Sequence, residues 1–151
     1  MRFPQSGGCQ CGAVRYEITA APTVVYVCHC RECQRQSGAA FAMAAVMPRE
    51  QFRITRGEAV NSPRTGDSGR TMLCWFCGAC GTRLYHSPAG LAQNCNLKPG
   101  TLDDTTWLRP SVHVWTRSRQ PWVQIPPDAT SFETQPEDRS WLTRRPDGLP
   151  A

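Results

Sequence analysis

The sequence predicts a single, mainly β domain built from antiparallel sheets. Many short segments alternate apolar and polar residues or are rich in β-branched residues, turn-forming residues separate them, and no long helical pattern occurs. The chain has 151 residues, which is enough for one domain with a core and too few for two ordinary domains. No internal repeat or linker is visible, so we expect one folding unit.

The first half of the chain contains four expected strands. Residues 13–18 alternate apolar and polar side chains, and residues 23–27 are β-branched and aromatic. Residues 39–47 are apolar throughout, a pattern that also suits a buried helix, but the surrounding strands favour a strand. Residues 52–55 alternate again and predict the fourth strand.

The second half continues this pattern. Further strands are expected at residues 70–76, 82–86, 91–97 and 112–115. Residues 61–69 contain Pro and Gly among small polar residues and predict an exposed loop. From residue 126 onward the pattern fades, so an irregular C-terminal stretch is expected, attached to the body by burial of Trp122 and Trp141.

One short helical element is expected beside a cysteine group. Polar residues 34–37 suit one helical turn, and Gly38 suits the left-handed residue that ends it.

No run of apolar residues is long enough to span a membrane, and no signal peptide is recognisable at the start of the sequence. We therefore expect a cytoplasmic protein without a membrane partner.

Seven of the nine cysteines lie in three groups at short spacings. They are Cys9 and Cys11, then Cys28, Cys30 and Cys33, and finally Cys77 and Cys80. In a reducing cytosol such groups indicate metal ligands rather than disulfides, and sulfur ligands favour zinc. Cys74 and Cys95 lie within apolar runs and are expected to belong to the core.

Seven thiols divide into four and three. A structural zinc has four protein ligands, whereas a catalytic zinc keeps one position open, so one closed and one open site fit this number. The spacing alone leaves the pairing undecided. Cys30 and Cys33 with Cys77 and Cys80 would form an ordinary zinc ribbon, but Cys28, Cys30 and Cys33 are also compact enough to hold one ion together.

Several other side chains near these groups are candidates for chemistry. His29 lies inside the second group and suits proton transfer or hydrogen bonding to a ligand; simple exposure is the alternative. His86 and His113 lie in expected strands and are interpreted as structural. Four arginines suit either carboxylate binding or a solvated surface: Arg15, Arg31, Arg35 and Arg83.

The charge of the chain does not favour a nucleic-acid partner. The formal net charge is +5, and seven thiolates with two divalent ions would reduce it to about +2. The basic residues are scattered rather than interleaved with aromatic residues. A small-molecule enzyme is therefore preferred, and a zinc-ribbon module that binds a protein or nucleic acid is the alternative.

Five motifs occur in a specific order. They are GCxCGxVRY at residues 8–16, CHCxxCxxxSG at 28–38, FCxxCGT at 76–82, GTLDD at 100–104, and PxxHVW at 110–115 before Trp122. In this order the chain resembles the glutathione-dependent formaldehyde-activating enzyme family, which includes centromere protein V, over about residues 6–123.

The resemblance implies a fold, two zinc sites and an activity. It implies a β-tent fold of antiparallel sheets with zinc-ribbon-like elements, in a domain at residues 1–125 followed by an irregular extension at 126–151 that packs on it. A structural zinc would be held by Cys9, Cys11, Cys77 and Cys80, and a substrate-facing zinc by Cys28, Cys30 and Cys33. The implied activity is that of a carbon-sulfur lyase on an adduct of a small thiol and an aldehyde, with S-hydroxymethylglutathione as the named example.

In this reaction Cys28, Cys30 and Cys33 would be catalytic through the open zinc that they hold. The ion would bind a thiol as thiolate, lower its pKa and polarise the carbonyl oxygen of the aldehyde. His29 or a water molecule would transfer the proton. The expected cofactor is thus Zn²⁺ at two ions per chain, and the expected partner is a small thiol or its aldehyde adduct, such as that of glutathione.

Overall fold

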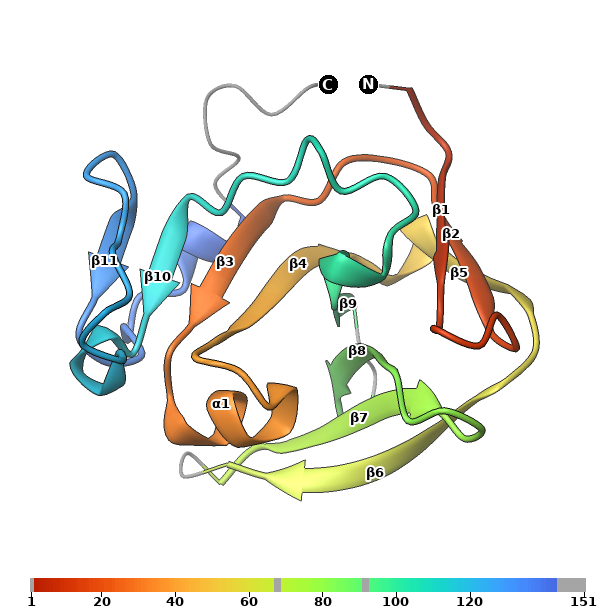
Figure 1. The fold of residues 1–151 in the computed structure, drawn as a ribbon, viewed down its shortest axis with the longest axis horizontal. Helices are drawn as coiled ribbons and strands as arrows, with labels where there is room; N and C mark the ends of the chain where they lie inside the picture. The colour runs from red at the N-terminus through yellow and green to blue at the C-terminus, as the bar shows by residue number, and fades with distance from the viewer. Residues whose placement is uncertain (1, 67–68, 91–92, 144–151) are drawn as a thin grey trace.

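The computed structural model describes residues 2–66, 69–90 and 93–143. The strands are β1 (Gln5–Gly8), β2 (Arg15–Ile18), β3 (Val24–Cys28), β4 (Ala42–Pro48), β5 (Phe52–Arg56), β6 (Ala59–Thr65), β7 (Thr71–Cys77), β8 (Arg83–Pro88), β9 (Asn94–Leu97), β10 (Val112–Val114) and β11 (Thr130–Phe132). The helical elements are α1 (Arg31–Ser37) and four short 3-10 turns at Arg49–Gln51, Pro99–Thr101, Thr116–Ser118 and Ser140–Leu142. The expected mainly β architecture is confirmed (Figure 1).

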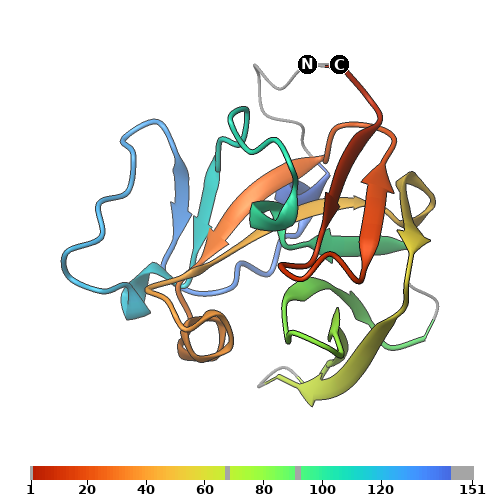
Figure 2. The same cartoon turned by 45° about the vertical axis from the view of Figure 1, so that its right-hand side comes forward.

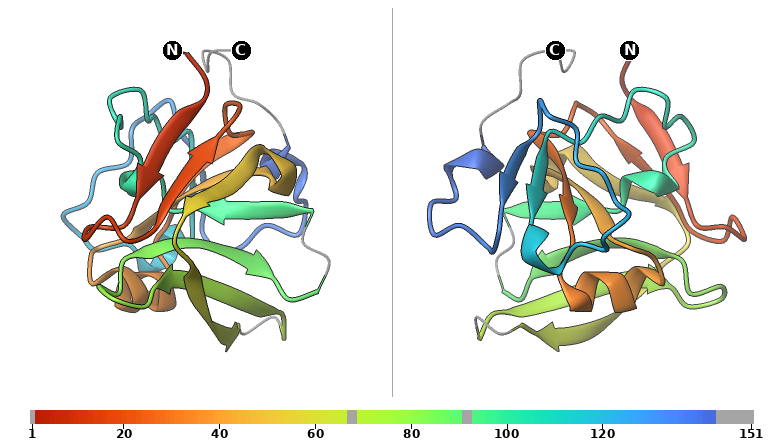
Figure 3. Two further views of the ribbon diagram at one scale, coloured as in Figure 1. Left: turned by 90° about the vertical axis from the view of Figure 1, so that its right-hand side faces the viewer. Right: turned by 60° about the vertical axis from the view of Figure 1, so that its left-hand side comes forward.

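The strands form two sheets. The smaller sheet has the order β1-β2-β5, and the larger has the order β11-β10-β3-β4-β9-β8-β7-β6. Among the described strands, pairing is antiparallel except that β10 runs parallel to both β3 and β11. The larger sheet is strongly curved, and α1 lies near the end of β3 and beside β7 (Figures 1 and 3).

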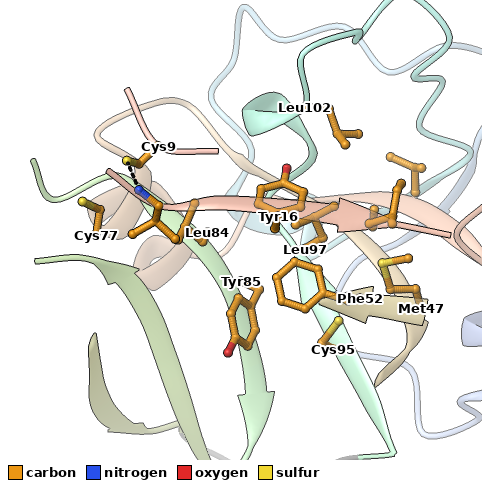
Figure 4. Packing of buried hydrophobic residues seen from close by; sticks show 14 residues of the cluster. Cys9, Tyr16, Met47, Phe52, Cys77, Leu84, Tyr85, Cys95, Leu97 and Leu102 are labelled. Atoms are coloured by element: carbon orange, nitrogen blue, oxygen red, sulfur yellow. Dashed lines mark hydrogen bonds between the residues drawn. The ribbon is translucent and has the colours of Figure 1, made fainter. Parts of the chain in front are cut away.

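The main core lies between the two sheets. Tyr16 of β2 and Phe52 of β5 are fully buried, and their rings lie 5.2 Å apart. Phe52 also contacts Tyr85 of β8, with 4.7 Å between ring centroids. Cys95 and Leu97 of β9 belong to the same buried cluster (Figure 4). Figure 2 shows the smaller sheet from another side. Burial of these large side chains stabilises the packing of one sheet on the other.

The helical turn expected before Gly38 is present and starts earlier than predicted. The Sγ atom of Cys30 accepts a hydrogen bond from the Cys33 amide and caps α1 at its first turn. Gly38 ends the helix in the left-handed conformation, with φ at 60°. Within the described residues, no helix is both long and apolar enough to cross a membrane.

The expectation of an exposed loop at residues 61–69 is wrong at its start, because residues 61–65 belong to β6. β6 is the edge strand of the larger sheet, and most of its side chains are exposed, so its sequence lacks the apolar alternation of a half-buried strand. Pro63 is tolerated there because an edge strand needs hydrogen bonds on one side only. Residues 67–68 lie outside the described residues, as do 91–92 at the start of the strand expected at 91–97.

The ends of the chain contain two strands without a sequence signal. β1 is rich in Gly and polar residues, and β11 lies in the stretch that was expected to be irregular. Trp141 is buried and contacts Tyr26 of β3 edge-on, as predicted. The expectation for Trp122 is wrong, since this side chain is 72 % exposed. The extension beyond residue 143 lies outside the described residues.

Candidate metal centres

The first thiol cluster joins two turns that are distant in sequence. Cys9 and Cys11 follow β1, whereas Cys77 ends β7 and Cys80 precedes β8. Their four sulfur atoms lie within 4.8 Å of one another, with Cys11 Sγ 3.5 Å from Cys9 Sγ and 3.8 Å from Cys77 Sγ. Sulfur atoms bound tetrahedrally to zinc at about 2.3 Å lie about 3.8 Å apart. The cluster therefore fits a closed zinc site.

Backbone hydrogen bonds shape the two turns in a similar way. The carbonyl of Cys9 accepts from the Gly12 amide at 3.0 Å, and that of Cys77 accepts from the Gly81 amide at 2.9 Å. The Val14 amide donates to Cys9 Sγ at 3.2 Å. Thr82 Oγ1 lies 3.2 Å from Cys80 Sγ, and this hydrogen bond lowers the pKa of Cys80 to about 5. Each turn thus contains one thiol whose pKa is lowered, Cys9 and Cys80, whereas the neighbouring sulfurs raise the pKa of Cys11 to about 11. A bound cation would stabilise all four as thiolates, as metal ligands require.

The second thiol cluster lies where β3 passes into α1. Cys28 ends β3, Cys30 caps the helix, and Cys33 lies in its first turn. The three sulfur atoms lie within 4.8 Å of one another, and Cys28 is buried while the other two are half-buried. The structure thus keeps Cys28, Cys30 and Cys33 together and places Cys77 and Cys80 with Cys9 and Cys11. The alternative ribbon pairing of Cys30 and Cys33 with Cys77 and Cys80 is not what the fold brings together.

Three sulfur atoms at this separation cannot all be anionic without a cation. Hydrogen bonds from the thiols of Cys28 and Cys33 lower the pKa of Cys30 to about 2. The same contacts raise the pKa of Cys28 far above its usual value. Ionisation of one thiol therefore disfavours ionisation of its neighbours, and a bound divalent cation would offset this repulsion. Three sulfur donors with a position left over fit zinc in an open site.

His29 is enclosed rather than exposed, so the alternative of simple exposure is wrong. Its ring is fully buried against Phe41 and His113, and its Nε2 lies 2.9 Å from His113 Nδ1. Its Nδ1 is buried and has no hydrogen-bond partner among the described residues. Burial, reinforced by His113 and Arg119, lowers the pKa of His29 to about 4, so the ring is neutral near pH 7. His113 is buried and hydrogen-bonded, as expected of a structural histidine.

A buried glutamine, which the sequence did not single out, holds the ligand loop. Gln34 Nε2 donates to the carbonyl of His29 at 2.6 Å and to that of Ser118 at 2.9 Å. Its Oε1 accepts from Arg31 at 2.7 Å and from Gln120 at 2.9 Å. All the hydrogen-bonding capacity of a buried amide is thus used to connect the second thiol cluster to residues 118–120.

The two remaining cysteines lie outside both clusters. Cys74 is buried and accepts a long hydrogen bond of 3.5 Å from Gln36 Nε2 of α1. Cys95 is fully buried in the main core, where burial raises its pKa to about 11. Both positions agree with the expected core role.

The four candidate arginines have different surroundings. Arg15 forms a two-pronged ion pair with Asp103, and Arg35 pairs with exposed Glu32 at 2.7 Å. Arg31 donates to Gln34, as described above. Arg83 is the exception: its Nε and Nη2 atoms are buried and find no hydrogen-bond partner within the described part of the chain. His86, three residues after Arg83 in β8, is half-buried.

The comparisons with known proteins agree with this arrangement. The family model described as "Glutathione-dependent formaldehyde-activating enzyme" matches residues 4–118, which contain both thiol clusters. A crystal structure of a protein from Rhodobacter sphaeroides shares the fold, with a TM-score of 0.53 and 24 % identity over 67 % of this chain and 90 % of that one.

Two curated fungal relatives are named "Putative glutathione-dependent formaldehyde-activating enzyme". The protein of Fusarium vanettenii is 31 % identical over 85 residues, which are 53 % of this chain and 45 % of that protein. The protein of Podospora anserina is 30 % identical over 81 residues, which are 51 % of this chain and 36 % of that protein. The match thus spans less than half the length of these relatives. The family model covers most of the chain, and the chain belongs to the glutathione-dependent formaldehyde-activating enzyme family.

Proposed function

We propose that the protein is a zinc-dependent carbon-sulfur lyase that acts on the adduct of a small thiol and formaldehyde, of the S-hydroxymethylglutathione type. The observation that carries this proposal is the division of the thiols into a group of four and a group of three. The closed group suits a structural ion and the open group suits an ion that also binds substrate. The family description supports glutathione as the thiol and formaldehyde as the aldehyde.

Cys28, Cys30 and Cys33 would hold the substrate-facing ion, and Cys9, Cys11, Cys77 and Cys80 the structural ion. When bound, zinc at an open site supplies Lewis acidity that lowers the pKa of a thiol and polarises a carbonyl oxygen. Three thiolate ligands reduce this acidity, so the site suits a bound thiolate better than activation of water.

Cleavage of the adduct requires one proton to leave its hydroxyl group. As the carbon-sulfur bond breaks, the carbon-oxygen double bond forms and the bonding electron pair stays with the departing sulfur. We assign the proton transfer to neutral His29, whose ring is held by His113 and whose Nδ1 is without a partner in the described structure, with water as the alternative carrier.

We also place the reaction in the cytoplasm. All nine cysteines are free thiols, and seven of them are gathered where oxidation would destroy the clusters. Such an arrangement depends on a reducing compartment, where glutathione is kept as a thiol.

The proposal is tested by thiol binding to the open site. In protein loaded with cobalt, glutathione and smaller thiols should change the cobalt-thiolate absorption, because an added sulfur completes a four-sulfur shell. The Cys30→Ala variant should show no such change, since it lacks a ligand of this site. Release of formaldehyde from the adduct, measured in parallel with zinc-loaded protein, should be lost in the same variant.

Two outcomes would contradict the proposal. Absence of a spectral change with every thiol up to about 10 mM, which covers affinities near −4 kcal/mol, would remove the support for a thiol substrate. Unchanged formaldehyde release in Cys30→Ala would show that the second thiol cluster does not take part. Either result would favour a zinc-ribbon module that binds a macromolecule.

A further inference from the structure

The face of the larger sheet that carries Cys28 continues across five strands. Directly paired residues of neighbouring strands point to the same side of a sheet. The pairs that follow this side from β3 to β7 are Cys28 with Ala42, Val46 with Asn96, Asn96 with His86, and His86 with Cys74. Gln36 of α1 reaches Cys74 from the same side. The second thiol cluster therefore lies over this face rather than at an isolated loop.

Three cationic side chains share this face. Lys98 follows Asn96 by two residues just beyond β9, and Arg83 pairs with Phe76, two residues from Cys74. Arg64 of the edge strand pairs with Met72, which is also two residues from Cys74. All three side chains are half-buried.

One of these cations, Lys98, lies beside the second thiol cluster. Its ammonium group interacts electrostatically with the thiols of Cys33, Cys28 and Cys74, and it is repelled by Arg83. The register agrees, because Leu97 pairs with Ala45 and the chain continues from there toward Ala42, which pairs with Cys28. Lys98 thus lies near Cys28 and Cys33, with Arg83 beside it.

Within residues 2–66, 69–90 and 93–143, none of these cations forms an ion pair with a carboxylate. The ion pairs of the described residues are Arg15–Asp103, Arg35–Glu32, Arg53–Glu17 and Arg109–Asp128. Arg83 Nε and Nη2 and Arg64 Nε are buried without a hydrogen-bond partner in the described part of the chain. A buried cationic group without a partner is costly and is normally paired with an anion.

The open site alone does not carry enough negative charge to neutralise both Lys98 and Arg83. Three thiolates with one divalent ion leave a single net negative charge, which offsets one cation. A second cation remains beside it, in a region that excludes much of the water and strengthens the attraction for an anion. This unbalanced positive charge favours the binding of an anionic group on the molecule that enters the site.

We propose that Lys98 and Arg83 bind a carboxylate of the substrate beside the cluster of Cys28, Cys30 and Cys33, with Arg64 adding positive charge. The inference rests on the proposed function in one respect, namely that the ligand of the open site is a thiol. It names the substrate class as small thiols that carry a carboxylate, in preference to neutral or cationic thiols. Lys98 and Arg83 are positioning residues, because they hold the substrate away from the reacting bond.

The anion preference can be measured without a thiol substrate. Iodoacetate and iodoacetamide alkylate the same sulfur atoms, have nearly the same size and differ in charge. With purified full-length protein of known metal content, we expect the ratio of the iodoacetate rate to the iodoacetamide rate at Cys28, Cys30 and Cys33, located by mass spectrometry, to fall about tenfold in Lys98→Met and in Arg83→Gln. Lys98→Arg keeps the charge and should keep the ratio.

Arg53→Met is the matched control, because it removes the same charge from an exposed position in the smaller sheet. Its ratio should equal that of the native protein. If Lys98→Met does not fold, Arg83→Gln carries the test, since the Nε and Nη2 atoms of Arg83 make no hydrogen bond to lose. An unchanged ratio in the folded variants would overturn the anion site.

A thiol series then separates this inference from the proposed function. In cobalt-loaded protein, 3-mercaptopropionate should bind about tenfold more tightly than 2-mercaptoethanol, and Lys98→Met should abolish the difference. Equal binding of the two thiols to native protein would overturn the inference and leave the proposed function intact. Binding of neither thiol, together with a normal alkylation preference, would overturn the proposed function and leave the anion site.

Discussion

Cys74 lies three residues before Cys77, the same spacing that separates Cys77 from Cys80, so spacing alone allows it to compete for an ion. Residues three apart on a strand point to opposite faces, however, and the structure places Cys77 in the four-thiol cluster and Cys74 beneath Gln36 of α1. We therefore expect Cys74→Ser to keep the metal stoichiometry of the native protein, measured by elemental analysis. Loss of one ion from this variant would show that Cys74 is a ligand.

The same comparison shows which site residues a sequence can reveal. Short spacing identified the three thiol groups as candidate ligands, but it left their pairing undecided. The combination of Cys9 and Cys11 with Cys77 and Cys80 was implied only by the family resemblance. His29 and His113 are 84 residues apart and meet only because β10 pairs parallel with β3. Lys98 belongs to none of the sequence motifs, and its position near Cys33 depends on the pairing of β9 with β4 and β8. Such contacts arise from strand order, which local pattern does not specify.

At the scale of elements, two glycines with nearly the same backbone conformation differ in their surroundings. Gly38 ends α1 at φ 60°, and a Cβ built there would meet no atom within 4 Å. Gly57 turns the chain between β5 and β6 at φ 69°, and its Cβ would lie 2.1 Å from the Ala13 carbonyl oxygen. We expect Gly38→Ala to lower the free energy of unfolding by about 1 kcal/mol, and Gly57→Ala by about 3 kcal/mol or more.

Urea unfolding of the two variants, each saturated with zinc, measures this difference. Gly38→Ala provides the matched control, since it introduces the same left-handed strain without the backbone clash. Equal losses in the two variants would mean that the turn at Gly57 can move away from Ala13, and that β5 and β2 are less firmly joined than their pairing indicates.

Elements were predictable where their side chains alternate in burial. β2, β3, β5 and β7 have such patterns or apolar runs, and the sequence located them. The sequence predicts a loop where residues 61–65 of β6 lie, because an edge strand with exposed side chains has no apolar face. β1 and β11 are short and polar, and their backbones become strands through pairing with β2 and β10.

At the scale of the whole molecule, the two thiol clusters close loops of very different size. The three-thiol cluster lies within the six residues from Cys28 to Cys33 and constrains one strand end and one helix turn. The four-thiol cluster connects Cys11 to Cys77, 66 residues apart, and so joins the hairpin of the smaller sheet to the β7–β8 turn of the larger sheet. An ion in the four-thiol cluster therefore restrains the unfolded chain far more than an ion in the other.

This difference predicts separate effects of losing each cluster. Cys77→Ala or Cys80→Ala should cost several kcal/mol of metal-coupled folding free energy, because one ligand of the ion that connects the two sheets is lost. Cys28→Ala or Cys33→Ala should leave a folded protein with one ion fewer.

Native protein should contain two zinc ions per chain and release one of them to a chelator much sooner, because an open site exchanges its fourth ligand. Elemental analysis measures the number of ions, circular dichroism measures folding, and a chelator time course measures the release of each ion. A single ion per native chain would show that the clusters do not divide into a structural and an open site. Equal unfolding of both pairs of variants would show the same.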